Sequence, residues 1–99
     1  MSEHYASGNW QVTPGCADEF VERWREFLGW TRDNHPGLES ATLIRSEDDP
    51  GRLVSFAIWA SAEQRDAWKH SDGFMERFAA CRQLCDDFTG GDYDRAITI

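Results

Sequence analysis

Two polar side chains in the second half of the sequence, Ser55 and His70, are candidates for chemistry. Histidine titrates near neutral pH and is the most frequent general acid or base, and a serine hydroxyl both donates and accepts hydrogen bonds. Ser55 belongs to the stretch "VSFAIWASAEQRDAW" (residues 54–68), which carries two large rings, Trp59 and Trp68. Because His70 follows two residues after Trp68, these side chains could share one catalytic site.

A slot for a flat ligand is the functional interpretation of this stretch. Ser55, Ala57 and Trp59 alternate along the chain and therefore share one face of an extended strand. The rings expected to close over that face are Trp68, Phe74 and Phe78. Small side chains beside large rings would leave an open space, whereas in the alternative the same rings interdigitate as a closed core. His70 has a similar alternative, as a histidine in a solvated loop.

Composition and charge argue against several classes of function. The 99-residue chain has a formal net charge of −8, whereas binding to nucleic acid or to an anionic membrane needs clustered Lys and Arg. No stretch approaches the roughly 18 apolar residues of a membrane helix, and residues 1–8 lack the apolar segment of a signal peptide. Three cysteines, an odd number, fit reduced thiols. We therefore expect a cytoplasmic protein without nucleic-acid or membrane partners.

Motifs for cofactors and metals are missing from the sequence. No glycine spacing fits a dinucleotide fingerprint or a phosphate loop, and no Cys or His pair has the spacing of a metal site. Cys81 and Cys85 lie one helical turn apart, and we favour buried structural thiols over metal or redox chemistry for them. We therefore expect neither a bound cofactor nor a metal ion.

The elements that must position these residues follow from apolar periodicity and turn signals. The predicted strands cover residues 5–12, 38–45, 52–59 and 93–99. The predicted helices cover residues 16–34, 61–68 and 71–88. The last helix depends on an apolar stripe with steps of four and three residues, formed by Phe74, Phe78, Cys81, Cys85 and Phe88. The turn signal "SEDDPG" predicts that the second and third strands form an antiparallel hairpin.

This order of elements predicts one α+β domain over residues 1–99. Two split units give a ferredoxin-like βαββαβ fold, with a four-stranded antiparallel sheet and the helices on one face. The third strand is also apolar on the face opposite Ser55, where it carries Val54, Phe56 and Ile58. Because the helices can cover only one face, that second face would leave apolar surface exposed to water. We therefore predict a homodimer formed through the sheet faces.

Three segments of the chain resemble the antibiotic biosynthesis monooxygenase (ABM) family. These are "TPGCADEFVERWREFL", "HPGLESATLIRSEDDPGRLVSFAIWASAEQRDAW" and "HSDGFMERF", and the resemblance extends from about residue 5 to residue 99. It implies a dimeric α+β barrel and a cofactor-independent monooxygenase, an oxidoreductase that acts on a small quinol- or anthrone-like aromatic substrate. Because some members have no assigned activity, a non-catalytic barrel that binds an apolar ligand is the alternative. A stabilising subunit whose own rings fill the pocket is a third possibility.

The resemblance also bears on individual residues. Oxygenases of this family often have Asn at the position of Ser55 and Trp at the position of Trp59, and a serine has the shorter reach. Haem-degrading members resemble this chain at Trp68, but their iron-binding histidine falls on Phe78, which cannot bind a metal. Their asparagine on the first strand falls nearest Gly8. The resemblance therefore implies an oxygenase site around Ser55 and argues against haem degradation.

Overall fold

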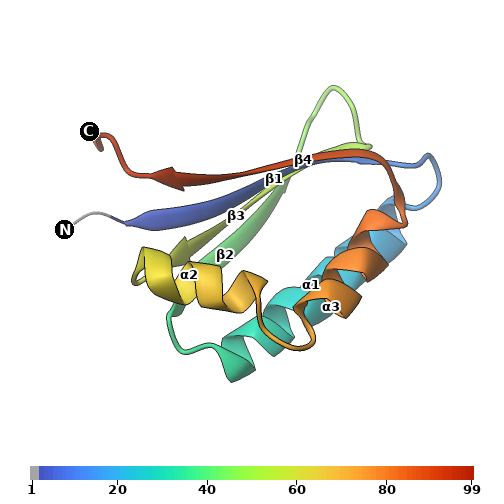
Figure 1. The fold of residues 1–99 in the computed structure, drawn as a ribbon. Coiled ribbons are helices and arrows are strands. Elements are labelled where there is room, and N and C mark those ends of the chain that lie inside the picture. Colours follow the sequence, from blue (N-terminus) through green and yellow to red (C-terminus); the bar gives the residue numbers. More distant parts are fainter. Residues whose placement is uncertain (1–2) are drawn as a thin grey trace.

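The computed structural model describes residues 3–99, in which three helices cover one face of a four-stranded sheet (Figure 1). The strands are β1 (His4–Val12), β2 (Leu38–Arg45), β3 (Arg52–Trp59) and β4 (Cys85–Asp94). The helices are α1 (Ala17–Asn34), α2 (Ala62–Lys69) and α3 (Phe74–Arg82). All strand pairs are antiparallel, in the order β2-β3-β1-β4. The predicted ferredoxin-like α+β fold is therefore confirmed.

The helices begin and end at the signals that the sequence carries. Ser61 Oγ accepts a hydrogen bond from the backbone N–H of Gln64 at 3.1 Å and caps the start of α2. α3 follows Gly73, whose φ of 90° lies in the left-handed region that favours glycine. α1 ends at Asn34, just before a proline disfavours helical geometry. Within residues 3–99, no helix combines the length and the apolar character that crossing a bilayer requires.

The end of the last helix and the position of the last strand differ from the prediction. α3 ends at Arg82 and β4 begins at Cys85, whereas the sequence predicted a helix to Phe88 and a strand over 93–99. Phe88 lies on β4 opposite Trp10 of β1, and the residues after β4 form no strand. Pairing with β1 satisfies the backbone of this Asp- and Gly-rich segment, and that gain outweighs its low intrinsic strand preference.

Cross-strand pairing puts small side chains side by side on the face that the helices cover. In one row, Gly8 of β1 lies between Ser55 of β3 and Gly90 of β4. In the neighbouring row, Ala6 of β1 lies opposite Ala57 of β3. Because side chains in such pairs stand next to one another, two adjacent rows of small residues leave space above the sheet.

Buried thiols join the end of α3 to the start of β4. Cys81 and Cys85 are both free and buried. Burial raises the pKa of Cys81 from 9.0 to about 12 and that of Cys85 from 9.0 to about 11. Because the thiolate is the reactive form, both side chains are poor nucleophiles and poor metal ligands at neutral pH. The structure therefore supports their interpretation as structural thiols.

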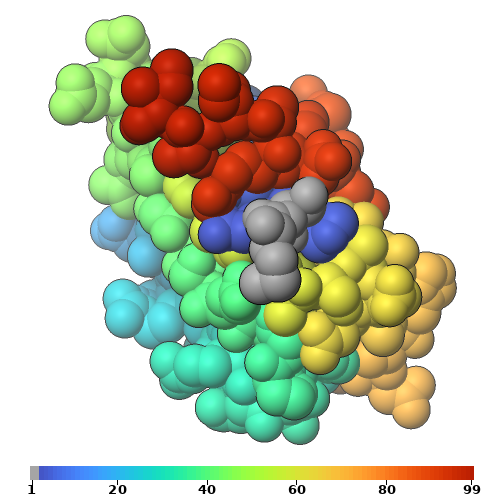
Figure 2. Space-filling view, turned by 90° about the vertical axis from the view of Figure 1, so that its left-hand side faces the viewer, coloured from blue at the N-terminus to red at the C-terminus, as the bar shows by residue number. Residues whose placement is uncertain are grey.

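The opposite face of the sheet carries no helix and is partly apolar. Val54, Phe56 and Ile58 of β3 alternate onto this face and are each partly exposed. On the same face, Ile44 of β2 and Tyr93 of β4 are 51% and 57% exposed. Figure 2 shows one end of the molecule, where C-terminal residues (red) lie above the start of β1 (blue) and α2 (yellow) lies below it. We call the sheet face that carries Val54, Phe56 and Ile58 the bare face.

Candidate functional site: an aromatic cavity between sheet and helices

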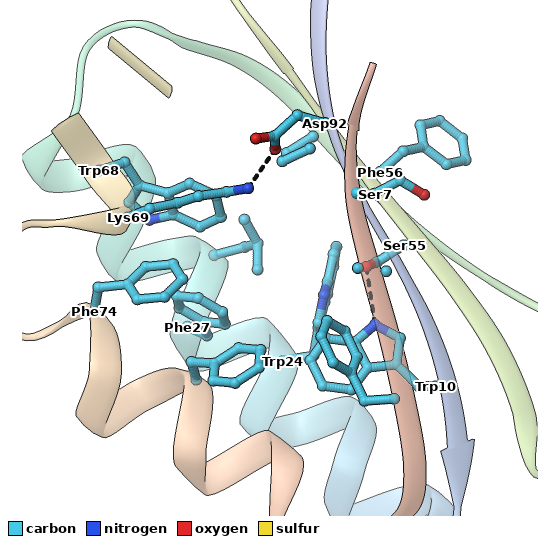
Figure 3. Close-up of a pocket in the computed structure, with 18 residues that line it drawn as sticks. Ser7, Trp10, Trp24, Phe27, Ser55, Phe56, Trp68, Lys69, Phe74 and Asp92 are labelled. Carbon is cyan, nitrogen blue, oxygen red and sulfur yellow. Dashed lines mark hydrogen bonds and ion pairs between the residues drawn. The ribbon is translucent and has the colours of Figure 1, made fainter. Parts of the chain in front are cut away.

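A cavity of about 370 Å³ lies between the rows of small residues and the helices (Figure 3). Its floor includes Ala6, Gly8, Ser55, Ala57 and Gly90. Its walls include the rings of Trp10, Trp24, Phe27, Trp68, Phe74, Phe78 and Phe88. This volume lies at the small end of the range of roughly 300–1,000 Å³ for small-molecule pockets. The cavity therefore suits one small, flat and largely apolar molecule.

The aromatic walls are held together by contacts centred on Trp68. Its ring centroid lies 5.6 Å from that of Phe27, 4.8 Å from that of Phe74 and 5.0 Å from that of Trp59. Trp68 Nε1 donates a hydrogen bond of 2.9 Å to Thr31 Oγ1. The Thr31 hydroxyl in turn donates to the backbone carbonyl of Phe27 at 2.9 Å. These contacts fix the orientation of the rings before any ligand enters.

Ser55 supplies a buried hydroxyl on the cavity floor. The residue is 8% exposed, and its Oγ accepts a hydrogen bond from Trp10 Nε1 at 2.9 Å (Figure 3). A Cβ atom at the neighbouring Gly8 would lie 2.9 Å from Ser55 Oγ and 2.8 Å from Trp10 Nε1, so this close approach requires glycine. Because Ser55 Oγ is the acceptor in the bond with Trp10, its O–H group can still donate a hydrogen bond to a ligand oxygen.

Lys69 and Asp92 form an ion pair at the mouth of the cavity (Figure 3). Among the described residues, they are the charged side chains that line it, and they are 32% and 39% exposed. Asp92 lies two residues beyond Gly90 on β4, and two strand spacings separate β4 from β3. The Cα atoms of Asp92 and Ser55 are therefore about 7 Å apart along the strands and about 10 Å apart across them.

Not all of the predicted site residues line the cavity. Those that do are Ser55, Ala57, Trp68, Phe74 and Phe78. Trp59 is completely buried beside Trp68, and among the described residues its Nε1 has no hydrogen-bond partner. His70 is exposed at the end of α2, where its Nδ1 donates to the carbonyl of Asp66 at 2.8 Å. Its ring is therefore bonded to its own helix, outside the cavity.

Several residues that line the cavity were not among those predicted from the sequence. Trp10 and Gly8 alternate on the first predicted strand, and that alternation was a signal for a shared inward face. Phe88 was assigned to the predicted last helix instead of to a strand. No signal pointed to the contact between Lys69 and Asp92, which are 23 positions apart, because it depends on where β4 pairs with β1.

The family model for antibiotic biosynthesis monooxygenase (ABM) matches residues 4–80. The chain belongs to the ABM family. The matched region runs from β1 into α3 and includes Ser55 and most of the aromatic walls. β4, which brings Asp92 to the mouth of the cavity, lies outside the matched region.

Solved structures share the fold of this ABM protein over nearly its whole length. A variant of SnoaB, a cofactor-independent oxygenase from Streptomyces nogalater, has a TM-score of 0.89 and 22% sequence identity, and the alignment covers 98% of this chain and 96% of SnoaB. A conserved protein from Methanosarcina mazei Go1 has a TM-score of 0.83, 20% identity and coverage of 94% and 92%. A protein from Shewanella oneidensis has a TM-score of 0.82, 16% identity and coverage of 95% and 91%. No curated protein sequence matches the chain.

Proposed function

We propose that this ABM protein is a cofactor-independent monooxygenase of a small, electron-rich aromatic substrate such as a quinol or an anthrone. The observation that supports this function is the aromatic cavity with the buried hydroxyl of Ser55 on its floor. SnoaB, which shares the fold over 96% of its length, is described as a cofactor-independent oxygenase. Free cysteine thiols support the cytoplasm as the location of this activity.

The substrate itself would supply the electrons for this reaction. For an anthrone, the methylene carbon loses two hydrogens, one atom of O₂ becomes the new carbonyl oxygen, and the other atom leaves with those hydrogens as water. The protein would hold the rings between its aromatic walls, and the Ser55 hydroxyl would donate a hydrogen bond to a substrate oxygen. The walls would also keep bulk water away from the electron-rich substrate.

Replacing Ser55 with alanine tests the role of the hydroxyl. Oxygen uptake by the chelator-treated protein, with a panel of anthrones and dihydroxynaphthalenes, should fall about a hundredfold, since a positioned donor to a developing negative charge is lost. The variant should also unfold more easily by about 1–3 kcal/mol in urea, because the buried N–H of Trp10 loses its acceptor. Ser40→Ala is the matched control, because Ser40 is an exposed serine of the same sheet, on β2, and does not line the cavity.

The outcome of this experiment separates two candidate functions. Equal oxygen uptake by the Ser55→Ala and Ser40→Ala variants would refute the assigned role of Ser55. Tight binding of the panel without uptake by the unsubstituted protein would favour a barrel that binds an apolar ligand without chemistry. The position of His70 outside the cavity is the observation that favours this second function, because it removes the predicted acid–base group from the site.

We also propose that two copies of this protein pair through their bare faces. Phe56 lies near the centre of that face, and replacing it with aspartate would bury an unpaired charge in the interface. The 11.4 kDa chain should sediment at twice its mass, and the Phe56→Asp variant as a monomer. Gln83→Asp, at the exposed end of α3, should leave the dimer intact. A monomeric unsubstituted protein at tens of micromolar concentration would contradict this proposal.

A further inference from the structure

Lys69 is a charged residue at the mouth of an otherwise aromatic cavity. It is the only lysine of the chain and the last residue of α2. Figure 3 shows its side chain reaching from the helix layer toward Asp92 on β4. The lysine ammonium is a compact charge on a flexible stem, so it can change partners at little cost. About one third of the side chain is exposed, which leaves it room to move.

Asp92 would not be left unpaired if Lys69 moved away. Arg65 Nε lies 3.7 Å from Oδ1 of Asp92, the same oxygen that Lys69 contacts. Arg65 is held in place, because it is 9% exposed, donates to the carbonyl of Tyr5 at 3.3 Å and lies 3.3 Å from Asp66. The two cations thus differ: Arg65 is a fixed partner of Asp92, and Lys69 is a releasable one.

This difference favours an anionic ligand over a neutral one at the cavity mouth. A neutral ligand leaves Lys69 paired with Asp92, and it gains no charge interaction. An anionic oxygen can take the ammonium of Lys69 while Arg65 continues to neutralise Asp92. A cationic ligand would have to displace the anchored Arg65 or compete with Lys69 for a carboxylate that both already contact.

We propose that Lys69 selects substrates that carry an anionic oxygen, a carboxylate or a phenolate, at one edge of a planar ring system. The inference rests on the proposed function for the identity of the substrate, but binding itself can be measured without turnover. The separation between the cavity mouth and Ser55, about 7 Å along the strands and 10 Å across them, suits a ligand of three fused rings. A cation beside a phenol also favours its ionised, more electron-rich form.

Quenching of tryptophan fluorescence measures this selectivity directly, because Trp10, Trp24 and Trp68 line the cavity. The probes are anthraquinone-2-carboxylate, the neutral anthraquinone-2-carboxamide, and 2-hydroxyanthraquinone as the phenol. We expect the carboxylate to bind about tenfold more tightly than the carboxamide. This ratio lies near the lower limit of what a hydrogen bond to a charged group contributes to binding, because the mouth of the cavity is partly exposed to water. If 2-hydroxyanthraquinone, and not the carboxylate, binds more tightly than the carboxamide, and this difference depends on Lys69, the anionic oxygen is a phenolate.

Variants of the ion pair identify the residue responsible. Lys69→Met keeps the length of the side chain and should abolish the preference for the carboxylate, whereas Lys69→Arg should keep it. Asp92→Asn should keep or increase the preference, because a repulsive carboxylate is removed. Arg25→Met is the control for net charge, since Arg25 lies on the exposed side of α1, paired with Glu22 and outside the cavity.

The possible results separate the role of Lys69 from the monooxygenase activity. An equal preference in the Lys69→Met variant, a loss of preference in the Arg25→Met control, or tighter binding of the carboxamide would overturn the role of Lys69. The same holds if none of the three probes binds. A preference that depends on Lys69 without any oxygen uptake would uphold this inference and overturn the proposed function. Oxygen uptake with neutral anthrones and no preference for anions would uphold the monooxygenase activity and overturn the role of Lys69.

Discussion

The Ala57→Leu variant is expected to lose ligand binding and oxygen uptake while remaining folded. Ala57 is 5% exposed and lies on the cavity floor, so the added carbons would occupy the space where a planar ring would lie. A displacement of the substrate by about 1 Å can reduce the rate about a hundredfold, and a leucine here would exclude more than that. Because the new side chain fills an existing cavity, the free energy of unfolding should stay the same or rise by about 0.5–2 kcal/mol.

Ala41→Leu provides a matched control for this substitution. Ala41 of β2 lies opposite Ala57 of β3 on the same face of the sheet, but it lines a groove between β2 and α1 and not the cavity. Quenching of tryptophan fluorescence and oxygen uptake should change only in the Ala57 variant, and urea unfolding should show both proteins folded. If Ala57→Leu binds and oxidises substrates normally, the cavity is not the site.

Replacing Trp68 with phenylalanine should destabilise the protein more than the same substitution at Trp59. Trp59 is the more deeply buried, with 0% of its surface exposed against 5% for Trp68. Both substitutions remove the same ring volume, but only Trp68 loses a hydrogen bond, to Thr31. Trp59→Phe instead removes an N–H that has no partner within residues 3–99. Because an unpaired buried donor costs about 1–3 kcal/mol, we expect the two variants to differ by at least about 1 kcal/mol.

Urea unfolding of both phenylalanine variants and of Trp68→Ala measures this difference. The alanine variant should lose about 3–5 kcal/mol, the usual cost of deleting a buried tryptophan, because the rings of Phe27 and Phe74 lose their common neighbour. If Trp59→Phe costs as much as Trp68→Phe, then the Trp59 N–H does have a partner in solution, such as a bound water molecule.

Most of the fold could be predicted from local signals in the sequence. The nearly continuous apolar run in residues 52–59 predicted the strand, and the two-residue period of a strand predicted which side chains share a face. The structure buries Leu53, Ser55, Ala57 and Trp59 on one side. The capping residue Ser61 predicted the start of α2 within one residue. These signals succeed because hydrogen bonds and side-chain periodicity within one element depend on neighbouring residues.

The C-terminal segment shows where local signals fail. The spacing of Cys85 and Phe88 continues the helical stripe of Phe74 and Phe78, yet both residues lie on β4. Their spacing of three residues fits a helical period, so periodicity indicated a helix. Both side chains lie on one face of β4 only because the register with β1 shifts between Gln11 and Val12. The decision came from β1, whose edge offers backbone hydrogen bonds to this segment.

The amino-acid sequence by itself determined the order of the elements, the inward face of β3 and the resemblance that the family match confirmed. Only the tertiary structure decided that a cavity is open, because Gly8 and Gly90 must stand beside Ser55 in the register of three strands. It also decided that Lys69 meets Asp92. Periodicity and capping are properties of one stretch of chain, whereas empty space and charge pairing depend on side chains that are far apart in sequence and adjacent only after folding.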